Sequence, residues 1–325
     1  MNARDFIAAT ASLAVALALL PLQSQAQQYP ARPIKVVVGY SAGGAVDIVA
    51  RTLGQSLSSS MGQPVIVENK PGAGTNIAVR SVIDAPADGY TLLLAANALA
   101  ANMALYTPPP FDAEKDLVPV SLVGRVPVVI AANPSVPYST IAQLIAAAKA
   151  RPNTISFASP GNGSTPHMAG ELFARAAGIQ LQHVPYRGGA QAITDVIGGQ
   201  VPLLAVNALE AKPHVASGKL KILAVLSPQR SPIFPDAPTI AQSGYPGFEA
   251  SVWYALMAPA ATPKPVVDKL HDEVQKALAS SEVRERMTAV GGEVIPGSQA
   301  DLARLLRAER QRYANLVREA KITPD

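Results

Sequence analysis

Short runs of β-branched and apolar residues alternate with amphipathic segments through most of this 325-residue chain. The first run, 34–38, reads IKVVV, which is typical of a strand buried on both faces of a parallel sheet. The same patterns predict strands at 65–67, 91–94, 154–157, 201–206 and 220–226, and helices at 77–83, 141–149, 164–178, 262–278 and 298–316. This alternation restricts the chain to the α/β class, with parallel or mixed sheets that helices cover.

Capping residues mark several of the predicted helix starts. Ser139 or Thr140 precedes the helix at 141–149, and Ser164 or Thr165 opens the next one. Ser298 stands three residues before Asp301, which is the spacing of a capping box. The arginines behind that box, Arg304, Arg307, Arg310 and Arg312, are interpreted as a solvated helix face.

Two extended segments predict a division into two lobes joined by a two-segment hinge. The chain is about twice the usual length of one domain, and the extended segments span 117–132 and 248–259. A chain that leaves one lobe and later returns builds that lobe from both of its ends. We expect one lobe from 27–125 plus 252–325 and the other from 126–251, able to close around a ligand.

The N-terminus indicates export. Residues 6–22 are almost uninterruptedly apolar, and Ser24-Gln25-Ala26 follows with small residues where a signal peptidase cuts. We expect residues 1–26 to be a signal peptide cleaved after Ala26, which places the mature protein in the periplasm. The alternative is an uncleaved membrane anchor, because the apolar run approaches spanning length.

Composition excludes several functional classes. The chain has no cysteine, so disulfides, zinc–thiolate sites and iron–sulfur clusters are excluded. Lysine and arginine total 27 against 23 acidic residues, with no polybasic run, so no nucleic-acid partner is expected. The four histidines lack metal-ligand spacing and no nucleotide-binding glycine loop occurs, so neither a metal nor a cofactor is expected.

Three glycine-rich turns between a strand and a helix are the candidate ligand loops. They span 40–47, 69–76 and 159–167. Glycine lets the backbone approach a ligand, and the following helix presents unpaired N–H groups and partial positive charge to an anion. An ordinary tight turn is the alternative for the first loop. Because ligands of open α/β sheets lie beyond the carboxyl ends of strands, the three loops are expected to converge on one cleft.

No enzyme motif is evident, and no catalytic residue is assigned. The G-x-S-x-G and H-E-x-x-H patterns do not occur. A hydrolase built from Ser164, His167 and Asp195 is conceivable, but His167 follows Ser164 by only three residues at a helix start. Asp47 and Asp195 are expected near helix beginnings, where capping or bracing a loop is the alternative to contacting a ligand.

A series of ordered motifs covers essentially the whole chain and resembles one family of exported receptors. The motifs are YPARPI at 29–34, SAGG-x-x-D at 41–47, ENKPGAG at 68–74, ADGYTL at 87–92, GSTPH at 163–167, GELF at 170–173, HVPYRG at 183–188, GQV at 199–201 and GKL at 218–220. With these motifs the chain resembles the Bug family, the extracytoplasmic solute receptors of tripartite tricarboxylate transporters.

The resemblance implies a fold and a set of ligand-binding residues. The fold is the two-lobed type II periplasmic-binding-protein fold, often called a Venus flytrap. The implied mode of binding holds a carboxylate by backbone N–H groups, small hydroxyls and waters of the first loop, with further groups from the same lobe and from the facing one. Carried over by position, the candidates are Tyr40, Ser41, Ala42, Gly43, Gly44, Asp47, Thr75, Asn76, Asn97, Ser164, Thr165, His167, Asp195 and Asn207.

The sequence departs from the family pattern at Val206. Relatives often carry an aspartate just before the asparagine that is Asn207 here, whereas this chain has an apolar valine. We expect the change to remove a partner for a ligand amine, which disfavours amino acids relative to simple or aromatic carboxylates.

The leading hypothesis is a monomeric periplasmic receptor that captures a small mono-, di- or aromatic carboxylic acid for a membrane transporter it contacts transiently. The alternative partner is a sensor kinase, and a secreted hydrolase is the remaining alternative.

Overall fold

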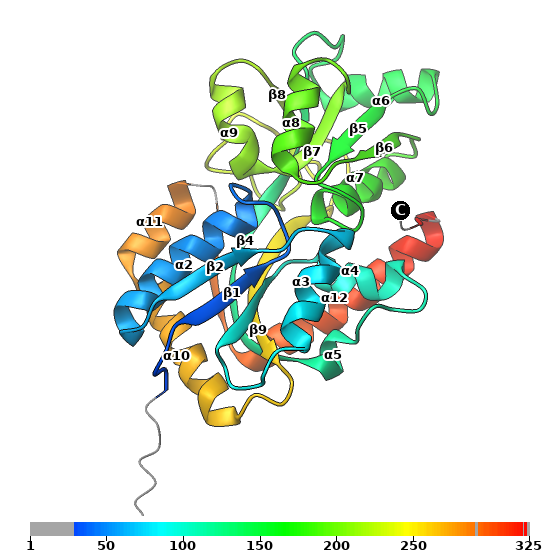
Figure 1. The fold of residues 1–325 in the computed structure, drawn as a ribbon. Helices are drawn as coiled ribbons and strands as arrows, with labels where there is room; N and C mark the ends of the chain where they lie inside the picture. The colour runs from blue at the N-terminus through cyan, green and yellow to red at the C-terminus, as the bar shows by residue number, and fades with distance from the viewer. Residues whose placement is uncertain (1–28, 290–291, 321, 324–325) are drawn as a thin grey trace, which may run out of the picture. The chain divides into compact units, whose positions relative to one another are not determined.

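The computed structural model describes residues 29–289, 292–320 and 322–323 (Figure 1). The predicted signal peptide at 1–26 and its cleavage after Ala26 lie outside these residues. All the helices and strands described below belong to the unit that begins at Arg32. No helix in the described part of the chain combines the length and the apolar character that crossing a membrane requires.

The first sheet mixes parallel and antiparallel strands. Its β1 (Ile34–Val38) lies between two parallel neighbours, β2 (Val65–Asn69) and β3 (Thr91–Ala95). Beyond β3 the pairing becomes antiparallel, through β9 (Ser251–Pro259) to β4 (Leu117–Ala132) and β10 (Glu293–Gly297). The parallel part follows from its βαβ connections, which return the chain to the same edge of the sheet.

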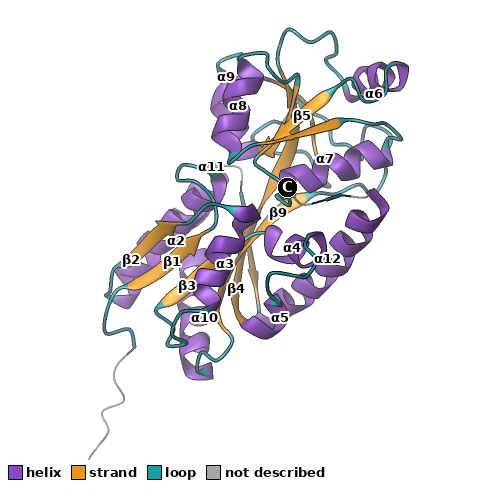
Figure 2. Ribbon diagram, turned by 45° about the vertical axis from the view of Figure 1, so that its right-hand side comes forward, coloured by secondary structure: helices purple, strands orange, loops and turns teal. Residues whose placement is uncertain are grey.

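Helices cover both faces of this sheet. One group packs together around α2 (Ala45–Met61), with α10 (Lys264–Ala279) and α11 (Ser281–Ala289). The other group shares one hydrophobic core and consists of α3 (Asn76–Ile83), α4 (Ala98–Leu105) and α12 (Gln299–Ala320). Figure 2 shows α4 and α12 side by side. The short α5 (Ala113–Asp116) precedes β4.

The second sheet is built from the middle of the chain. The strand β5 (Ser156–Ser159) is parallel to both β6 (Gln182–Pro185) and β7 (Leu203–Asn207), while β7 and β8 (Lys221–Val225) run antiparallel to the end of β4. Its helices are α6 (Ile141–Ala150), α7 (Thr165–Ala176), α8 (Gly189–Ile197) and α9 (Ala208–Ala216). A second hydrophobic core joins α8 and α9 to these strands.

One long strand belongs to both sheets. Residues 117–127 of β4 pair with β9, and residues 128–132 pair with β7 and β8. This strand coincides with the extended segment predicted at 117–132, because a run of valines and alanines buried on both faces suits a strand that crosses between two cores. The lobe limits predicted from the sequence, 27–125 plus 252–325 and 126–251, stay a prediction.

The helix caps agree with the sequence, whereas the strands predicted at 154–157 and 201–206 both begin two residues later than predicted. The Oγ1 of Thr140 accepts the N–H of Gln143, and Ser298 and Asp301 exchange reciprocal bonds as a capping box. The strand predicted at 154–157 begins only at Ser156. The reason is local: the hydroxyl of Thr154 bonds back to the carbonyl of Arg151, which keeps this residue in the turn.

Candidate functional site

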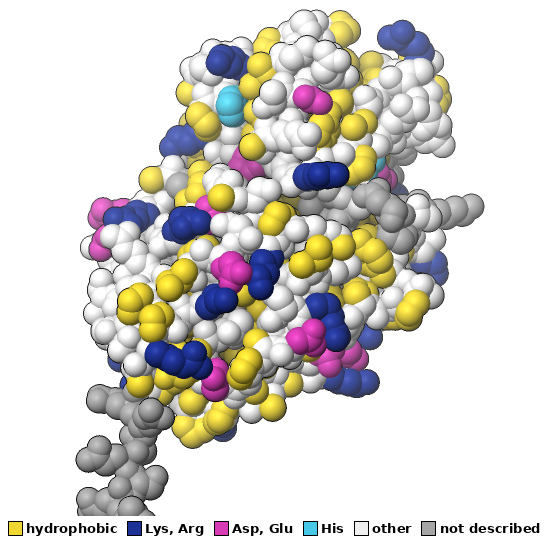
Figure 3. Space-filling model, viewed as in Figure 1, with side chains coloured by type: hydrophobic (Ala, Val, Ile, Leu, Met, Phe, Trp, Pro, Cys, Tyr) yellow, Lys and Arg dark blue, Asp and Glu magenta, His cyan; other side chains and the backbone are white. Residues whose placement is uncertain are grey.

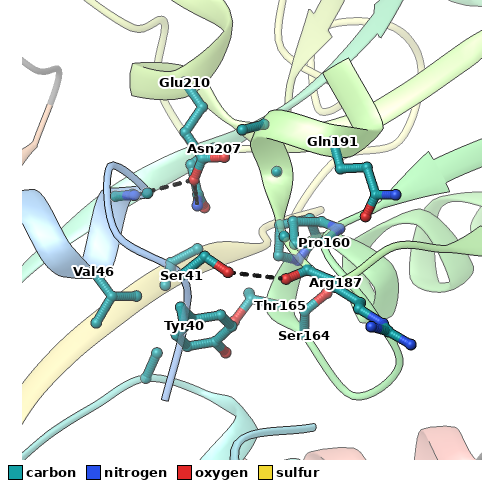
Figure 4. Close-up of a pocket in the computed structure, with 18 of the residues that line it drawn as sticks. Tyr40, Ser41, Val46, Pro160, Ser164, Thr165, Arg187, Gln191, Asn207 and Glu210 are labelled. Atoms are coloured by element: carbon teal, nitrogen blue, oxygen red, sulfur yellow. Dashed lines mark hydrogen bonds between the residues drawn. The ribbon is translucent and has the colours of Figure 1, made fainter. Parts of the chain in front are cut away.

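Four helices of the described chain begin at one cavity of about 200 Å³ (Figure 4). They are α2 from the first sheet and α7, α8 and α9 from the second. The first N–H groups of a helix have no partner within the helix, and the aligned peptide dipoles add partial positive charge there. The convergence therefore produces a site suited to negative charge.

The first loop supplies one wall of the cavity. The lining residues are Tyr40, Ser41, Ala42 and Gly44, with Ala45 and Val46 at the start of α2. The hydroxyl of Ser41 donates to the carbonyl of Arg187 at 3.4 Å, which joins this loop to the one before α8 (Figure 4). Ala42, Gly44, Ala45 and Val46 carry no polar side chain, so the polar groups of that stretch are those of the backbone.

The start of α7 supplies the opposite wall. Ser164 caps the helix by accepting the N–H of His167 at 3.4 Å, and its own hydroxyl donates to the carbonyl of Gly161 at 2.6 Å. The next residue, Thr165, is 3% exposed, and its hydroxyl is buried with no hydrogen-bond partner among the described residues. Buried polar atoms are almost always paired, so this hydroxyl indicates a place for a ligand or a water.

Glu210 of α9 reaches across to the start of α2. Its Oε1 accepts the N–H of Ala45 at 3.2 Å and the side-chain amide of Asn207 at 2.9 Å. Its Oε2 is buried without a partner in the described chain, as is the Oδ1 of Asn207. Burial raises the pKa of Glu210, and the two hydrogen bonds only partly oppose this. A carboxylate of the protein thus occupies part of the anion site.

The carboxylate of Glu210 affects the pKa of two neighbouring tyrosines. Burial, and then the charge of Glu210, raises the pKa of both Tyr40 and Tyr254. The only basic side chain among the described lining residues is Arg187, and its guanidinium points away from Glu210 and Asn207 (Figure 4). No cation within the described wall of the cavity therefore neutralises Glu210.

Asp47 braces the first loop and does not line the cavity. Its Oδ2 accepts the N–H of Gly43 at 2.9 Å and the Nε of Arg51 at 3.0 Å, while Oδ1 accepts the amide of Asn69 at 3.0 Å. Burial opposes ionisation, but these bonds and the charge of Arg51 outweigh it and lower the pKa of Asp47. Bracing, the alternative considered from sequence, describes its contacts in this structure.

The structure brings together about half of the residues proposed from the sequence. Among the described residues the cavity wall includes Tyr40, Ser41, Ala42, Gly44, Ser164, Thr165 and Asn207. Thr75 lines a neighbouring cavity of about 630 Å³, which also contacts Tyr40, Ser41 and Ser164. Neither cavity wall includes Gly43, Asp47, Asn76, Asn97, His167 or Asp195.

Three of those remaining side chains have partners elsewhere. The amide of Asn76 accepts from Asn102 at 2.7 Å, and Asn97 bonds the backbone of Trp253 at 2.9 Å within the core of the first sheet. Asp195 accepts the hydroxyl of Tyr186 at 2.7 Å. It lies near the end of α8 rather than at a helix beginning, so that prediction is wrong.

His167 belongs to a buried stack beneath the third loop. Its ring lies 3.8 Å from that of His183, with an interplanar angle of 13°, and its Nδ1 accepts the N–H of Gly163 at 3.2 Å. Burial, reinforced by the second histidine, holds the pKa of His167 well below its usual range, and burial lowers the pKa of His183 to about 4. Both rings are therefore neutral at physiological pH.

These contacts do not form a catalytic or metal centre. The hydroxyl of Ser164, the ring of His167 and the carboxylate of Asp195 make no hydrogen bond to one another, and the bond from the His167 backbone N–H to Ser164 is a helix cap. Within residues 29–289, 292–320 and 322–323, no cluster of three or more histidine, aspartate or glutamate side chains could hold a metal ion.

Sequence reasoning missed Glu210 and the start of α8. The pair Gly188-Gly189 follows the end of β6 after two intervening residues, so it is a fourth glycine turn between a strand and a helix that could have been recognised. Glu210 lies three residues after Asn207, in the first turn of its helix. Its contact with Ala45 joins residues 165 positions apart, and only the packed fold shows this contact.

Known proteins show the same pattern of sequence over nearly the whole length. A family model described as "Tripartite tricarboxylate transporter family receptor" matches residues 49–322. Protein BugT of Bordetella pertussis is 39% identical over 307 residues, which are 94% of this chain and 94% of that protein.

Solved structures are similar as well. The periplasmic binding protein BugD is 37% identical with a TM-score of 0.85, over 91% of this chain and 99% of that one. R. palustris Rpa4515, solved with adipate, is 33% identical with a TM-score of 0.87, over 91% and 100% of the two chains. MatC (Rpa3494) from Rhodopseudomonas palustris, solved with bound malate, is 31% identical with a TM-score of 0.84, over 89% and 100%.

Proposed function

This chain belongs to the tripartite tricarboxylate transporter receptor family, and from that premise we propose that it captures a small carboxylate in the cavity where four helices begin. The proposed binding residues are those of the sequence-derived set that line this cavity, from Tyr40 to Asn207, with the start of α8 added. Thr75 and the neighbouring cavity are proposed as the route by which the ligand enters.

Family membership confirms three of the predictions. The resemblance to the Bug family is confirmed, and the fold is the mixed α/β fold of periplasmic binding proteins. The chain is a solute-binding receptor and not an enzyme, because this family consists of binding proteins.

The convergence of helix starts is the observation that carries the proposal. Four helices begin at this small, largely apolar space, so the first N–H groups of each helix lie at its wall. A carboxylate that binds there loses its hydration water and is stabilised instead by the fixed dipoles of the helix starts. It therefore needs no lysine or arginine. Relatives solved with adipate and malate bind carboxylates, which favours the same ligand class here.

We further propose delivery to a membrane transporter, with closure of the lobes 27–125 plus 252–325 and 126–251 about β4 and the segment before β9. A sensor kinase stays the alternative partner, and a monomer without metal or cofactor is the proposed state. On the face shown in Figure 3, basic and acidic side chains are interspersed without a large patch of one sign.

A thermal-shift screen of the mature protein tests the carboxylate proposal. Ligand at about a hundred times its dissociation constant should add roughly 2.7 kcal/mol of stability. Binding of mono- or dicarboxylates that Thr165→Ala weakens without unfolding the protein would support the site. If sugars or neutral solutes stabilised the protein and no carboxylate did, the proposal would be wrong.

A further inference from the structure

Two side chains of the cavity wall, Glu210 and Asn207, each carry a hydrogen-bond acceptor that has no partner among the described residues. The Oε1 of Glu210 can be met by Asn207 only through the amide NH₂, since a carboxylate oxygen accepts. This contact fixes the orientation of the amide and leaves its Oδ1 buried with no partner in the described chain. Asn207 is 6% exposed, so solvent does not satisfy this oxygen.

Glu210 adds a second unpaired acceptor next to the first. Its Oε2 is buried, lies against the backbone of Gly189, and has no hydrogen-bond partner among the described residues. An unpaired acceptor in a buried place costs free energy comparable to a lost hydrogen bond. Two such atoms on neighbouring side chains indicate that the ligand supplies donors at this position.

The charge at this end of the cavity decides which donor fits. Arg187, the one basic lining residue in the described wall, turns its guanidinium away (Figure 4). The other titratable groups that interact with Glu210 are the hydroxyls of Tyr40 and Tyr254, which are neutral. A ligand carboxylate facing Glu210 would place two like charges together in a buried site, whereas an ammonium would neutralise Glu210 and provide three donors.

We propose that Glu210 makes this receptor selective for carboxylates that also carry an ammonium group, held between Glu210 Oε2 and Asn207 Oδ1. The carboxylate of the same ligand meets the helix starts and the free hydroxyl of Thr165. This reverses the expectation drawn from Val206: the partner for the amine comes from the next helix, three residues after Asn207. The inference rests on the proposed function and adds the ligand class.

Matched ligands that differ in one group test the proposal. The sets are aspartate, malate and succinate; glutamate, 2-hydroxyglutarate and glutarate; and alanine, lactate and propionate. Isothermal titration of the mature protein should show at least one amino compound binding about tenfold or more tighter than its deaminated analogue, with the hydroxy compound between them.

The variant Glu210→Gln should weaken that amino compound by about tenfold and change the deaminated analogue by less than about threefold. Glu171→Gln is the matched control, because Glu171 is another partly buried glutamate that lines neither cavity, and burial raises its pKa as well. The control should preserve the preference, and the unfolding temperature of each variant shows whether it is folded.

Four outcomes would overturn the inference, and they separate it from the proposed function. Deaminated compounds binding tighter than amino compounds, or a preference that Glu210→Gln leaves unchanged, would refute the role of Glu210 while the carboxylate receptor stands. Tighter binding of succinate at lower pH would indicate that protonated Glu210 donates to a ligand carboxylate instead. Binding by none of the nine compounds would overturn both.

Discussion

Two acidic side chains lie at the start of α2, and their surroundings differ completely. Asp47 accepts from Gly43, Asn69 and Arg51, so each of its oxygens is paired and its charge is neutralised. Glu210 accepts from Ala45 through one oxygen, while the other is buried and unpaired in the described chain. The fully paired Asp47 therefore shapes the loop, whereas the half-paired Glu210 is available to a ligand.

The largest expected effect is the loss of stability in Asp47→Asn. Both oxygens of Asp47 face donors, so the amide NH₂ that replaces one of them would meet a donor and leave a buried group unpaired. We expect a loss of roughly 2 to 4 kcal/mol in the free energy of unfolding, measured by urea denaturation. An unfolding curve that matches the wild type would show that Asp47 does not brace the loop.

The second expected effect is a loss of stability at acid pH. It arises from two buried histidines and must be distinguished from the titration of Asp47 and Glu210. The pKa of His183 falls from 6.5 to about 4 on burial, and that of His167 falls as well. Between pH 6.5 and 4 the unfolded chain takes up protons that the folded chain does not, so stability falls as pH falls, by at most about 3 kcal/mol for His183.

The variant His183→Gln should flatten this part of the stability curve, measured by unfolding at intervals from pH 7.5 to 4. The Glu210→Gln variant serves as the comparison and should keep the slope due to the histidines. A slope that His183→Gln leaves intact would assign the acid sensitivity to other groups.

The variant Gly189→Ala displaces the side chain of Glu210 while leaving that residue unchanged. A Cβ at Gly189 would lie 1.6 Å from Glu210 Oε2 and 3.3 Å from a methyl of Val206, so the carboxylate must move. We expect a loss of about 1 kcal/mol together with a weaker preference for amino compounds. In a Glu210→Ala background the stability cost should disappear, and additive costs in this double-mutant cycle would contradict the contact.

The smallest effect is expected for Glu210→Gln on stability, and its sign depends on pH. Burial raises the pKa of Glu210, so the folded chain holds this proton to higher pH than the unfolded chain, and ionisation destabilises the fold. The unfolding temperature of Glu210→Gln relative to wild type should therefore rise from pH 5 to pH 8. A relative decrease over this range would indicate that the charge of Glu210 stabilises the fold.

The sequence predicted the local features well because local physics produces them. The strand at 34–38, the cap at Thr140 and the box at Ser298 and Asp301 depend on neighbouring residues, and all are confirmed. The first loop and the first residues of α7, such as Ser41, Ser164 and Thr165, line the cavity as predicted, whereas Asn76 at the start of α3 does not.

The remaining parts of the site could not be predicted from residues that are neighbours in the sequence. Asn97 and Asp195 follow the family pattern, but packing pairs Asn97 with the backbone of Trp253 and Asp195 with the hydroxyl of Tyr186. Glu210 reaches the cavity only because β7 and α9 place it against Ala45 of a distant helix. Val206 stands where relatives often carry an aspartate, so the strand itself supplies no acid. The family motifs did not indicate that the following helix supplies Glu210 instead.

The most direct measurement is a crystal structure of the mature protein with the amino compound that binds best. The ligand carboxylate is expected among the starts of α2, α7, α8 and α9, with its nitrogen within hydrogen-bond distance of Glu210 Oε2 and Asn207 Oδ1. A ligand bound elsewhere, or one whose carboxylate is held by arginine and lysine side chains with Glu210 uninvolved, would contradict the account.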